Sequence, residues 1–228
     1  MTLKSLLNAI FPQRCLSCRK NTSGEPICQK CFSGIPINKT FFCGLCRARL
    51  ADNKKICHEK FPYILGAASE YSNEAVKNLI HGLKFKYIKD AAAPLGELLA
   101  LYIKTTGFQV KNFVVVPVPL SAKRLRERGF NQSELIAKSF AERVASPTET
   151  VALARIKNSK PQSGAKNVGE RRENVKACFS VVGPKFVANK NILLIDDVTT
   201  SGATMLEAAK TLKAAGAKKI VALAAARA

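Results

Sequence analysis

The sequence predicts an α/β protein with a mostly parallel, open sheet flanked by helices and preceded by a small cysteine-rich, metal-binding module. After residue 62, short runs of β-branched and other apolar residues alternate with helical patterns, as is typical of parallel strands covered on both faces. Seven of the eight cysteines lie before residue 58. We therefore expect a cysteine-rich module over residues 1–61 and a larger domain over residues 62–228.

The first four cysteines form two C-x2-C pairs, Cys15 with Cys18 and Cys28 with Cys31. Each pair places two thiolates on one tight turn, and two such pairs complete the tetrahedron that Zn²⁺ prefers. A disulfide framework is the alternative, but it requires an oxidising compartment and a secretory signal. Residues 1–12 offer only a short apolar patch without a small-residue cleavage site. We therefore expect structural Zn²⁺ on these four cysteines in a cytoplasmic protein.

The sequence leaves a second metal site open. Cys43 and Cys46 form a third pair and Cys57 follows, but Lys60 stands where the partner of Cys57 would fall. His58 is adjacent to Cys57, and neighbouring side chains rarely reach one metal ion. The three cysteines therefore form either a weakened second zinc site or none.

Four helices are predicted after the module. Apolar residues recur at helical spacing over residues 71–103, and the pattern divides into two helices near Asp90. Asn131 begins a third helix, because Asn at the cap with Glu134 three residues on resembles a capping box. A fourth helix is predicted over residues 203–215, where a glycine closes it.

Four apolar runs predict strands, and their composition fits a buried parallel sheet. The first run ends in Pro-Val-Pro, which cannot continue a central ladder. A polar stretch over residues 158–176 has no apolar period, and such a segment inside a domain is usually functional or disordered. The predicted strands cover residues 113–118, 179–182, 191–195 and 220–225.

The most informative segment is the predicted strand over residues 191–195 with the turn that follows it. The strand delivers Asp196 and Asp197 at its carboxyl end, where open α/β sheets bind ligands. The turn offers hydroxyls, backbone N–H groups and the positive end of a helix dipole, which suit a phosphate. The acids would repel a phosphate unless they accept hydrogen bonds from sugar hydroxyls, with Mg²⁺ balancing the charge. A simple helix cap would leave the acids unexplained, so we interpret the segment as a sugar-phosphate site. The turn residues are Thr199, Thr200, Ser201, Gly202, Ala203 and Thr204.

The chain is strongly basic, with 37 Lys and Arg against 16 Asp and Glu and a net charge of +21. Residues 1–60 hold 11 basic and 3 acidic residues, and the other 168 residues hold 26 and 13. The higher density in the module favours an extended anion as its partner, and solubilising surface lysines are the alternative. No apolar run approaches the ~20 residues needed to cross a bilayer, so we do not expect a membrane-spanning protein.

The apolar strand, acid pair and Thr-Thr-Ser-Gly-x-Thr turn resemble the phosphoribosyl-pyrophosphate motif of type I phosphoribosyltransferases. Residues 116–138, 162–166 and 171–179, with the C-x2-C-rich N-terminus, resemble the ComF family within that superfamily. The resemblance covers nearly the whole chain and implies a zinc-ribbon module before a type I phosphoribosyltransferase-like domain. The departure is the missing eighth ligand near Lys60.

The resemblance also implies roles for individual residues. The acid pair would hold the ribose 2′- and 3′-hydroxyls, and the turn after it would hold the 5′-phosphate. A basic cluster just after residue 118 would take the pyrophosphate, while the stretch over residues 158–176 would close over the site, with Arg171 or Arg172 available to the diphosphate. The predicted catalytic residues are Asp196, Asp197, Lys123 and Arg171, and the further pyrophosphate ligands are Ser121 and Arg124.

Two functions are compatible with these observations. The first is a phosphoribosyltransferase that uses phosphoribosyl pyrophosphate and Mg²⁺, with an acceptor that the sequence does not identify. ComF proteins are associated with DNA uptake in competent bacteria, so the second is a non-catalytic protein that handles single-stranded DNA through its zinc module. In that case the sugar-phosphate site would have a regulatory or anchoring role. The implied partners are phosphoribosyl pyrophosphate, single-stranded DNA and other competence proteins.

Overall fold

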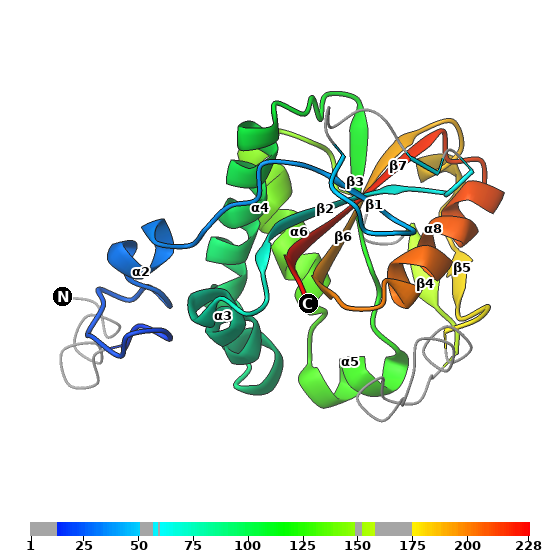
Figure 1. Ribbon diagram of the computed structural model, residues 1–228. Coiled ribbons are helices and arrows are strands. Elements are labelled where there is room, and N and C mark those ends of the chain that lie inside the picture. The colour runs from blue at the N-terminus through cyan, green and yellow to red at the C-terminus, as the bar shows by residue number, and fades with distance from the viewer. Residues whose placement is uncertain (1–12, 51–56, 59, 149–151, 158–174) are drawn as a thin grey trace.

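The computed structural model describes residues 13–50, 57–58, 60–148, 152–157 and 175–228, and a five-stranded sheet forms its centre (Figure 1). Its strands are β1 (Phe42–Cys43), β2 (Ile64–Glu70), β3 (Phe113–Pro117), β6 (Asn191–Thr199) and β7 (Lys219–Arg227). They lie in the order β1-β2-β7-β6-β3. All neighbouring pairs are parallel except β1 with β2. The predicted mostly parallel sheet is therefore confirmed.

Four long helices cover the two faces of this sheet (Figure 1). Three of them share one core with Leu193 and Ile195 of β6, while the fourth shares a second core with Ile192 and Leu194. Alternate residues of β6 thus face opposite layers of helix, which explains why the strand is an unbroken apolar run. The three helices of the first face are α3 (Glu74–Phe85), α4 (Ala92–Thr106) and α6 (Gln132–Val144), and α8 (Ala203–Ala214) covers the second.

Polar caps fix where the helices begin. The Asn73 side chain accepts a hydrogen bond from the Val76 amide at 3.1 Å before α3, and the Asn131 side chain accepts one from the Ser133 amide at 3.2 Å before α6. The predicted start of the third helix at Asn131 is thereby confirmed. None of the described helices combines the length and the apolar character that crossing a bilayer requires.

Four of the described strands differ from the sequence-based expectation, since β1, β2 and β4 are not predicted and β5 lies outside the main sheet. β5 (Phe179–Val181) is present, but it pairs with β4 (Leu153–Arg155) in a separate two-stranded antiparallel sheet. β2 is not predicted, because its sequence is rich in small residues with low strand propensity. Its burial and its pairing with β7 override that propensity. The shorter helices are α2 (Gln29–Ser33), α5 (Ala122–Arg128), η1 (Lys89–Ala91) and η3 (Pro184–Phe186).

The cysteine-rich segment packs directly on the larger domain. Leu16 and Ile27 are buried in the core that α3 and α4 share, and a Cβ placed on Gly82 of α3 would lie only 2.7 Å from Leu16 Cδ1. Further along, the Asn38 amide donates to the Ala68 carbonyl of β2 at 2.8 Å, just before β1 joins the sheet. The boundary near residue 61 stays a prediction, but the segment before it supplies part of the sheet.

Candidate functional site

Two adjacent carboxyl groups lie near the carboxyl end of β6, between strands β7 and β3. Asp196 is 9% exposed and Asp197 is 3% exposed. The Ser133 hydroxyl donates to Asp196 Oδ1 at 2.8 Å, and the Gln132 amide donates to Asp197 Oδ1 at 3.5 Å. Both partners belong to the first turn of α6, so that helix orients the acid pair.

Lys84 of α3 forms an ion pair with Asp197. Burial, together with the charge of Asp197, raises the pKa of Asp196 to about 8. Burial also opposes ionisation of Asp197, but the Lys84 ammonium outweighs it and holds the pKa of Asp197 below its usual value. The pair therefore holds a proton more readily than two isolated carboxyl groups would, and the Lys84 ammonium stabilises the ionised form of Asp197.

A cavity of about 460 Å³ opens beside the acid pair. Its basic side chains come from three separate elements, α3, α5 and β4. The Arg128 guanidinium also donates to Gln132 Oε1, which links α5 to the group that holds Asp197. Cations and carboxylates across one cavity suit a ligand that carries both phosphate and hydroxyl groups. The basic residues that line the cavity are Lys84, Arg124, Arg128 and Arg155.

The turn over residues 199–204 connects β6 to α8. Gly202 is the N-cap of α8 with a φ of +73°, a left-handed conformation that favours glycine. No side chain caps this helix, apart from a long contact of 3.4 Å between the Ala203 amide and Ser201 Oγ. Thr199 is 2% exposed, and its Oγ1 has no hydrogen-bond partner among the described residues. These donors match the phosphate cradle that the sequence predicts, and that assignment stays a prediction.

The structure separates the predicted residues into two groups. Asp196, Asp197, Arg124 and Thr204 line the cavity together. The Lys123 side chain is 70% exposed, is not among the residues lining the cavity, and its ammonium lies 3.9 Å from Glu127 Oε1 on the same helix. The Ser121 hydroxyl accepts from the Arg124 amide at 3.4 Å, so it caps α5. Arg171 and most of the 158–176 stretch lie outside the described residues.

Sequence reasoning misses several residues that border the acid pair. No motif singles out Lys84 within its predicted helix, and Arg155 lies in a strand that is not predicted. Gln132 and Ser133 fall within the 116–138 stretch that carries the family resemblance, which is the one signal that points to them. Neither residue has a periodicity or a charge that would single it out.

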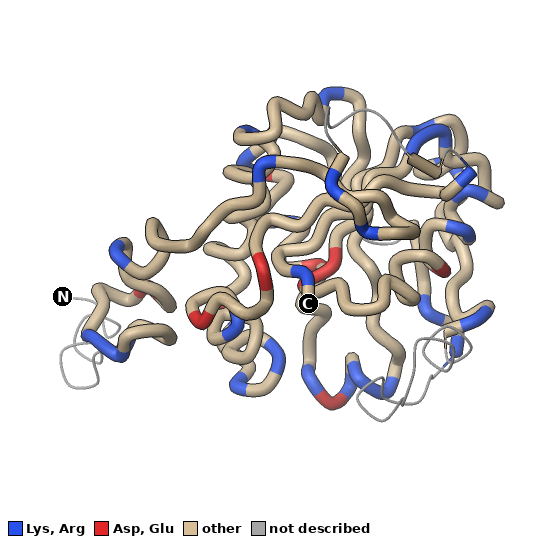
Figure 2. Tube along the Cα trace, in the orientation of Figure 1, with Lys and Arg blue, Asp and Glu red and all other residues tan. Residues whose placement is uncertain are grey.

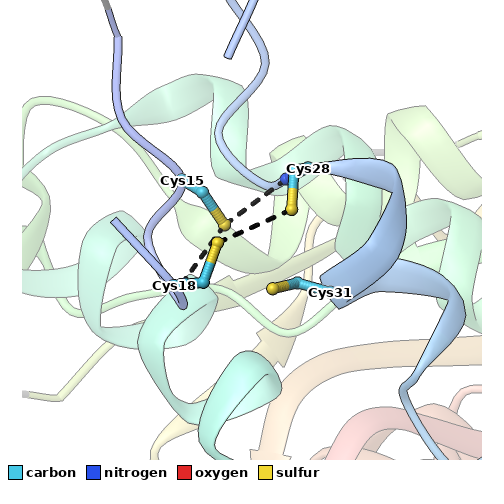
Figure 3. A group of neighbouring side chains, drawn as sticks. All are labelled: Cys15, Cys18, Cys28 and Cys31. Atoms are coloured by element: carbon cyan, nitrogen blue, oxygen red, sulfur yellow. Dashed lines mark hydrogen bonds between the residues drawn. The ribbon is translucent and has the colours of Figure 1, made fainter. Parts of the chain in front are cut away.

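The first four cysteines form one cluster, in which all ligand atoms lie within 4.8 Å of one another (Figure 3). Cys18 Sγ lies 3.7 Å from Cys28 Sγ. Two thiolates on a tetrahedron with Zn–S bonds of about 2.3 Å would be about 3.8 Å apart, so the spacing fits zinc. Burial opposes ionisation of Cys15, but the amides of Cys28 and Cys18 donate to its sulfur and lower its pKa to about 6.

A second four-ligand cluster consists of Cys43, Cys46, Cys57 and His58. The Cys46 and Cys57 sulfurs are 3.4 Å apart, and His58 Nδ1 lies 3.3 Å from Cys43 Sγ. The expectation that His58 would not join its neighbour at one metal ion is therefore wrong. Nδ1 is the ring nitrogen of His58 nearer to the backbone, and it lies 3.2 Å from the Cys57 sulfur. The two adjacent side chains can therefore reach the same point. When bound at these two clusters, zinc would crosslink turns and contribute folding energy.

Lysine and arginine residues are spread over much of the chain trace, and Figure 2 shows them on the N-terminal segment, on α5 and on the side of the molecule where α8 lies. They do not gather into one stripe in the described part of the molecule. The overall charge therefore does not by itself outline a track for a nucleic-acid strand.

Comparison with known proteins finds one family match near each end of the chain. A double zinc ribbon domain matches residues 6–60, and a phosphoribosyl transferase domain matches residues 127–228. These matches define a class of protein in which a paired zinc ribbon precedes a phosphoribosyltransferase-like α/β domain.

Three relatives match long stretches of the chain. Competence protein ComFC of Bacillus subtilis is 31% identical over 207 residues, covering 87% of this chain and 77% of that protein. Competence protein F of Haemophilus influenzae is 29% identical over 225 residues, covering 92% and 95%. DNA utilization protein YhgH of Escherichia coli O157:H7 is 32% identical over 146 residues, which span 62% of this chain and 63% of that protein. The chain belongs to the ComF family.

Solved structures give weaker likenesses. A glutamine phosphoribosylpyrophosphate amidotransferase from B. subtilis, complexed with ADP and GMP, is 19% identical with a TM-score of 0.40, covering 75% of this chain and 31% of that one. The protein TT1426 from Thermus thermophilus is 16% identical with a TM-score of 0.34, covering 58% and 72%. Scores this low do not bear on function.

Proposed function

We propose that the protein binds phosphoribosyl pyrophosphate and transfers its ribose 5-phosphate to an amine acceptor. The observation that carries this proposal is the buried acid pair at the end of β6, set between a basic cavity and the uncapped N-terminus of α8. Asp196 and Asp197 would accept hydrogen bonds from the ribose hydroxyls, and residues 199–204 would bind the 5′-phosphate. Arg124 and Arg128 would face the pyrophosphate.

In the reaction, the bond from sugar C1 to the pyrophosphate oxygen breaks, and its electron pair leaves with the pyrophosphate. A bond forms from the acceptor nitrogen to C1, and that nitrogen releases a proton. The arginines of the cavity would stabilise the departing negative charge. Lys123 and Arg171 remain predicted contributors, and closure of the 158–176 stretch over the site would exclude water.

The acid pair also fits a divalent cation. Two adjacent carboxyl groups offer the oxygen donors that Mg²⁺ prefers, and because burial and the charge of Asp197 raise the pKa of Asp196, a cation beside the pair would favour its ionisation. Bound Mg²⁺ would neutralise part of the charge on the diphosphate. Asp196 and Asp197 are the carboxylates nearest to where it would be needed.

The double substitution Asp196→Asn/Asp197→Asn is expected to weaken binding of phosphoribosyl pyrophosphate by at least about 100-fold, because it removes the two carboxylate charges that strengthen the hydrogen bonds to the ribose hydroxyls. Calorimetry in Mg²⁺ measures it. Asp90→Asn, which changes an exposed acid, is the matched control and should bind as the unaltered protein does. Unaltered affinity in the double variant would sink the site assignment. A screen of amines and nucleobases for pyrophosphate release would then identify the acceptor.

A second candidate function is the handling of single-stranded DNA. The names of the relatives, DNA utilization protein and Competence protein, favour it, as does the excess of 8 basic residues before residue 61. The DNA would lie along the zinc ribbons in the cytoplasm, where other competence proteins would be partners. Outside the N-terminal segment the basic residues are spread over the chain trace, so DNA binding is the second candidate function after the sugar-phosphate proposal.

Replacing Arg14, Lys20 and Lys30 by Gln tests this second function. All three are exposed on the N-terminal segment. If each contacts one phosphate, the slope of log affinity against log salt should fall by about 2 in magnitude, at about 0.7 per contact for single strands. Fluorescence anisotropy with a labelled oligonucleotide measures it. A triple Gln variant of the exposed Lys185, Lys190 and Lys218 is the control, and equal slopes in the two variants would count against the zinc ribbons as the DNA site.

A further inference from the structure

An arginine of the cysteine-rich segment reaches the turn that precedes α8. Arg47 directly follows the cluster residue Cys46, and its amide donates to the Cys43 carbonyl at 3.0 Å. A Cβ placed on Gly202 would lie 2.8 Å from Arg47 Nη2 and 3.2 Å from the Tyr63 hydroxyl. The second cysteine cluster therefore holds a guanidinium against the N-cap of α8, far away in sequence.

The Arg47 guanidinium lacks a counter-charge within the described part of the chain. Its Nη2 is buried without a hydrogen-bond partner, and no ion pair joins it to a described carboxylate. Burial lowers the pKa of Arg47, the Tyr63 hydroxyl beside it acts in the opposite direction, and the positive charge of Arg227 adds to the lowering. Arg227 itself is paired with Glu70, with 2.8 Å between its Nε and the carboxylate oxygen. That carboxylate therefore already has a partner.

Holding the Arg47 guanidinium beside the N-terminus of α8 is energetically unfavourable unless an anion binds between them. The N-terminus of a 12-residue helix carries a partial positive charge, and the guanidinium adds a full one beside it. At the other end of the turn, the buried Thr199 hydroxyl also has no partner among the described residues. A phosphate group supplies several acceptor oxygens and up to two negative charges, which is what these donors lack.

We propose that Arg47 is a further ligand for the phosphate group of the sugar phosphate, so that the second zinc ribbon contributes a residue to the site of the larger domain. The proposal rests on the proposed function, since it assigns the partner of the 199–204 turn. It predicts that the phosphate end of the ligand depends on Arg47, whereas the diphosphate end depends on the arginines of α5.

The experiment measures binding of ribose 5-phosphate and of inorganic pyrophosphate, each by calorimetry, to the full chain with zinc. Arg47→Met should weaken ribose 5-phosphate about 10- to 100-fold, the worth of one charge-assisted contact, and leave pyrophosphate within about twofold. Arg47→Lys keeps the positive charge but lacks the planar pair of donors of a guanidinium, so it should recover part of the lost affinity for ribose 5-phosphate. Arg49→Met changes an exposed arginine two residues on and is the matched control for both ligands.

Zinc content and thermal unfolding of each variant separate a binding defect from a folding defect. If Arg47→Met does not fold, Arg47→Lys decides, with an expected loss of about 3- to 10-fold for ribose 5-phosphate. Unchanged affinity for ribose 5-phosphate in a folded Arg47 variant would overturn the role of Arg47 and leave the proposed function intact. Arg47-dependent binding of ribose 5-phosphate without any binding of phosphoribosyl pyrophosphate overturns the proposed function alone. An unaltered protein that binds neither ligand overturns both.

Discussion

Cys18→Ser and Cys46→Ser are each expected to lower the zinc content from two ions per chain to one. Each substitution removes one of four ligands from a different cluster, and both side chains are exposed, so the loss of packing is small. Structural zinc contributes on the order of 10 kcal/mol to the folding of small metal-binding modules, so each variant should also unfold at a markedly lower temperature. Metal analysis of the purified protein, with thermal unfolding alongside, checks both effects.

The control for this pair is Cys178→Ala, which changes a buried cysteine that belongs to neither cluster. It should retain two zinc ions and lose only the stability that a small cavity costs. One zinc ion in the unaltered protein would contradict the second cluster, and two in Cys46→Ser would exclude that cysteine as a ligand.

Lys84→Met is expected to destabilise the protein by about 3 kcal/mol at pH 8, because it leaves the buried Asp197 carboxylate without its partner. Lys84 depresses the pKa of Asp197 in the folded protein. A depressed carboxyl pKa contributes stability that is present above the unfolded pKa of about 4 and is lost as the pH falls through the folded pKa. The difference between the two proteins should therefore stay constant from about pH 5 to pH 9 and shrink as the pH falls below about 4.

Urea unfolding across this pH range measures the effect, and two further variants sharpen it. Lys77→Met removes a lysine of the same helix whose side chain is 45% exposed and lies 3.4 Å from Glu74, and it should cost less than about 1 kcal/mol. Asp197→Asn combined with Lys84→Met should recover most of the loss, since no buried charge remains unpaired. A loss that is independent of pH and unrelieved by Asp197→Asn would show that Lys84 acts by packing alone.

The helices and the central strands could be predicted because their signals are local. The apolar residues of α3 recur at helical spacing because one stripe of the helix is buried. The apolar run of β6 is unbroken because both faces of the strand are buried. β2 could not be predicted, because its small residues suit close packing rather than isolated strand propensity. Gly66 is an example, since a Cβ there would lie 2.4 Å from a methyl group of Leu223.

The candidate site was predictable only where one segment carries several of its groups. The acid pair and the turn after it lie within nine residues of sequence, so their chemistry is visible in the chain. Lys84, Arg155 and Arg47 reach the same region from separate helices, strands and turns. Their contribution depends on tertiary packing, which no local pattern encodes. The prediction for His58 fails for a similar reason. The expectation that neighbouring side chains rarely reach one metal ion takes no account of the backbone conformation of the turn, which directs both side chains to the same point.

The backbone contacts that residues 38–43 make along β2 have a consequence for solubility. β2 would otherwise be the outermost strand of the sheet, and a strand with unpaired amides and carbonyls is a template for pairing with another molecule. Asn38, Phe42 and Cys43 occupy that row of groups through the Asn38–Ala68 hydrogen bond and the β1–β2 ladder. Because Cys43 is also a cluster residue, loss of metal would release this cover. Demetallated protein should then self-associate through the freed strand before the larger domain unfolds.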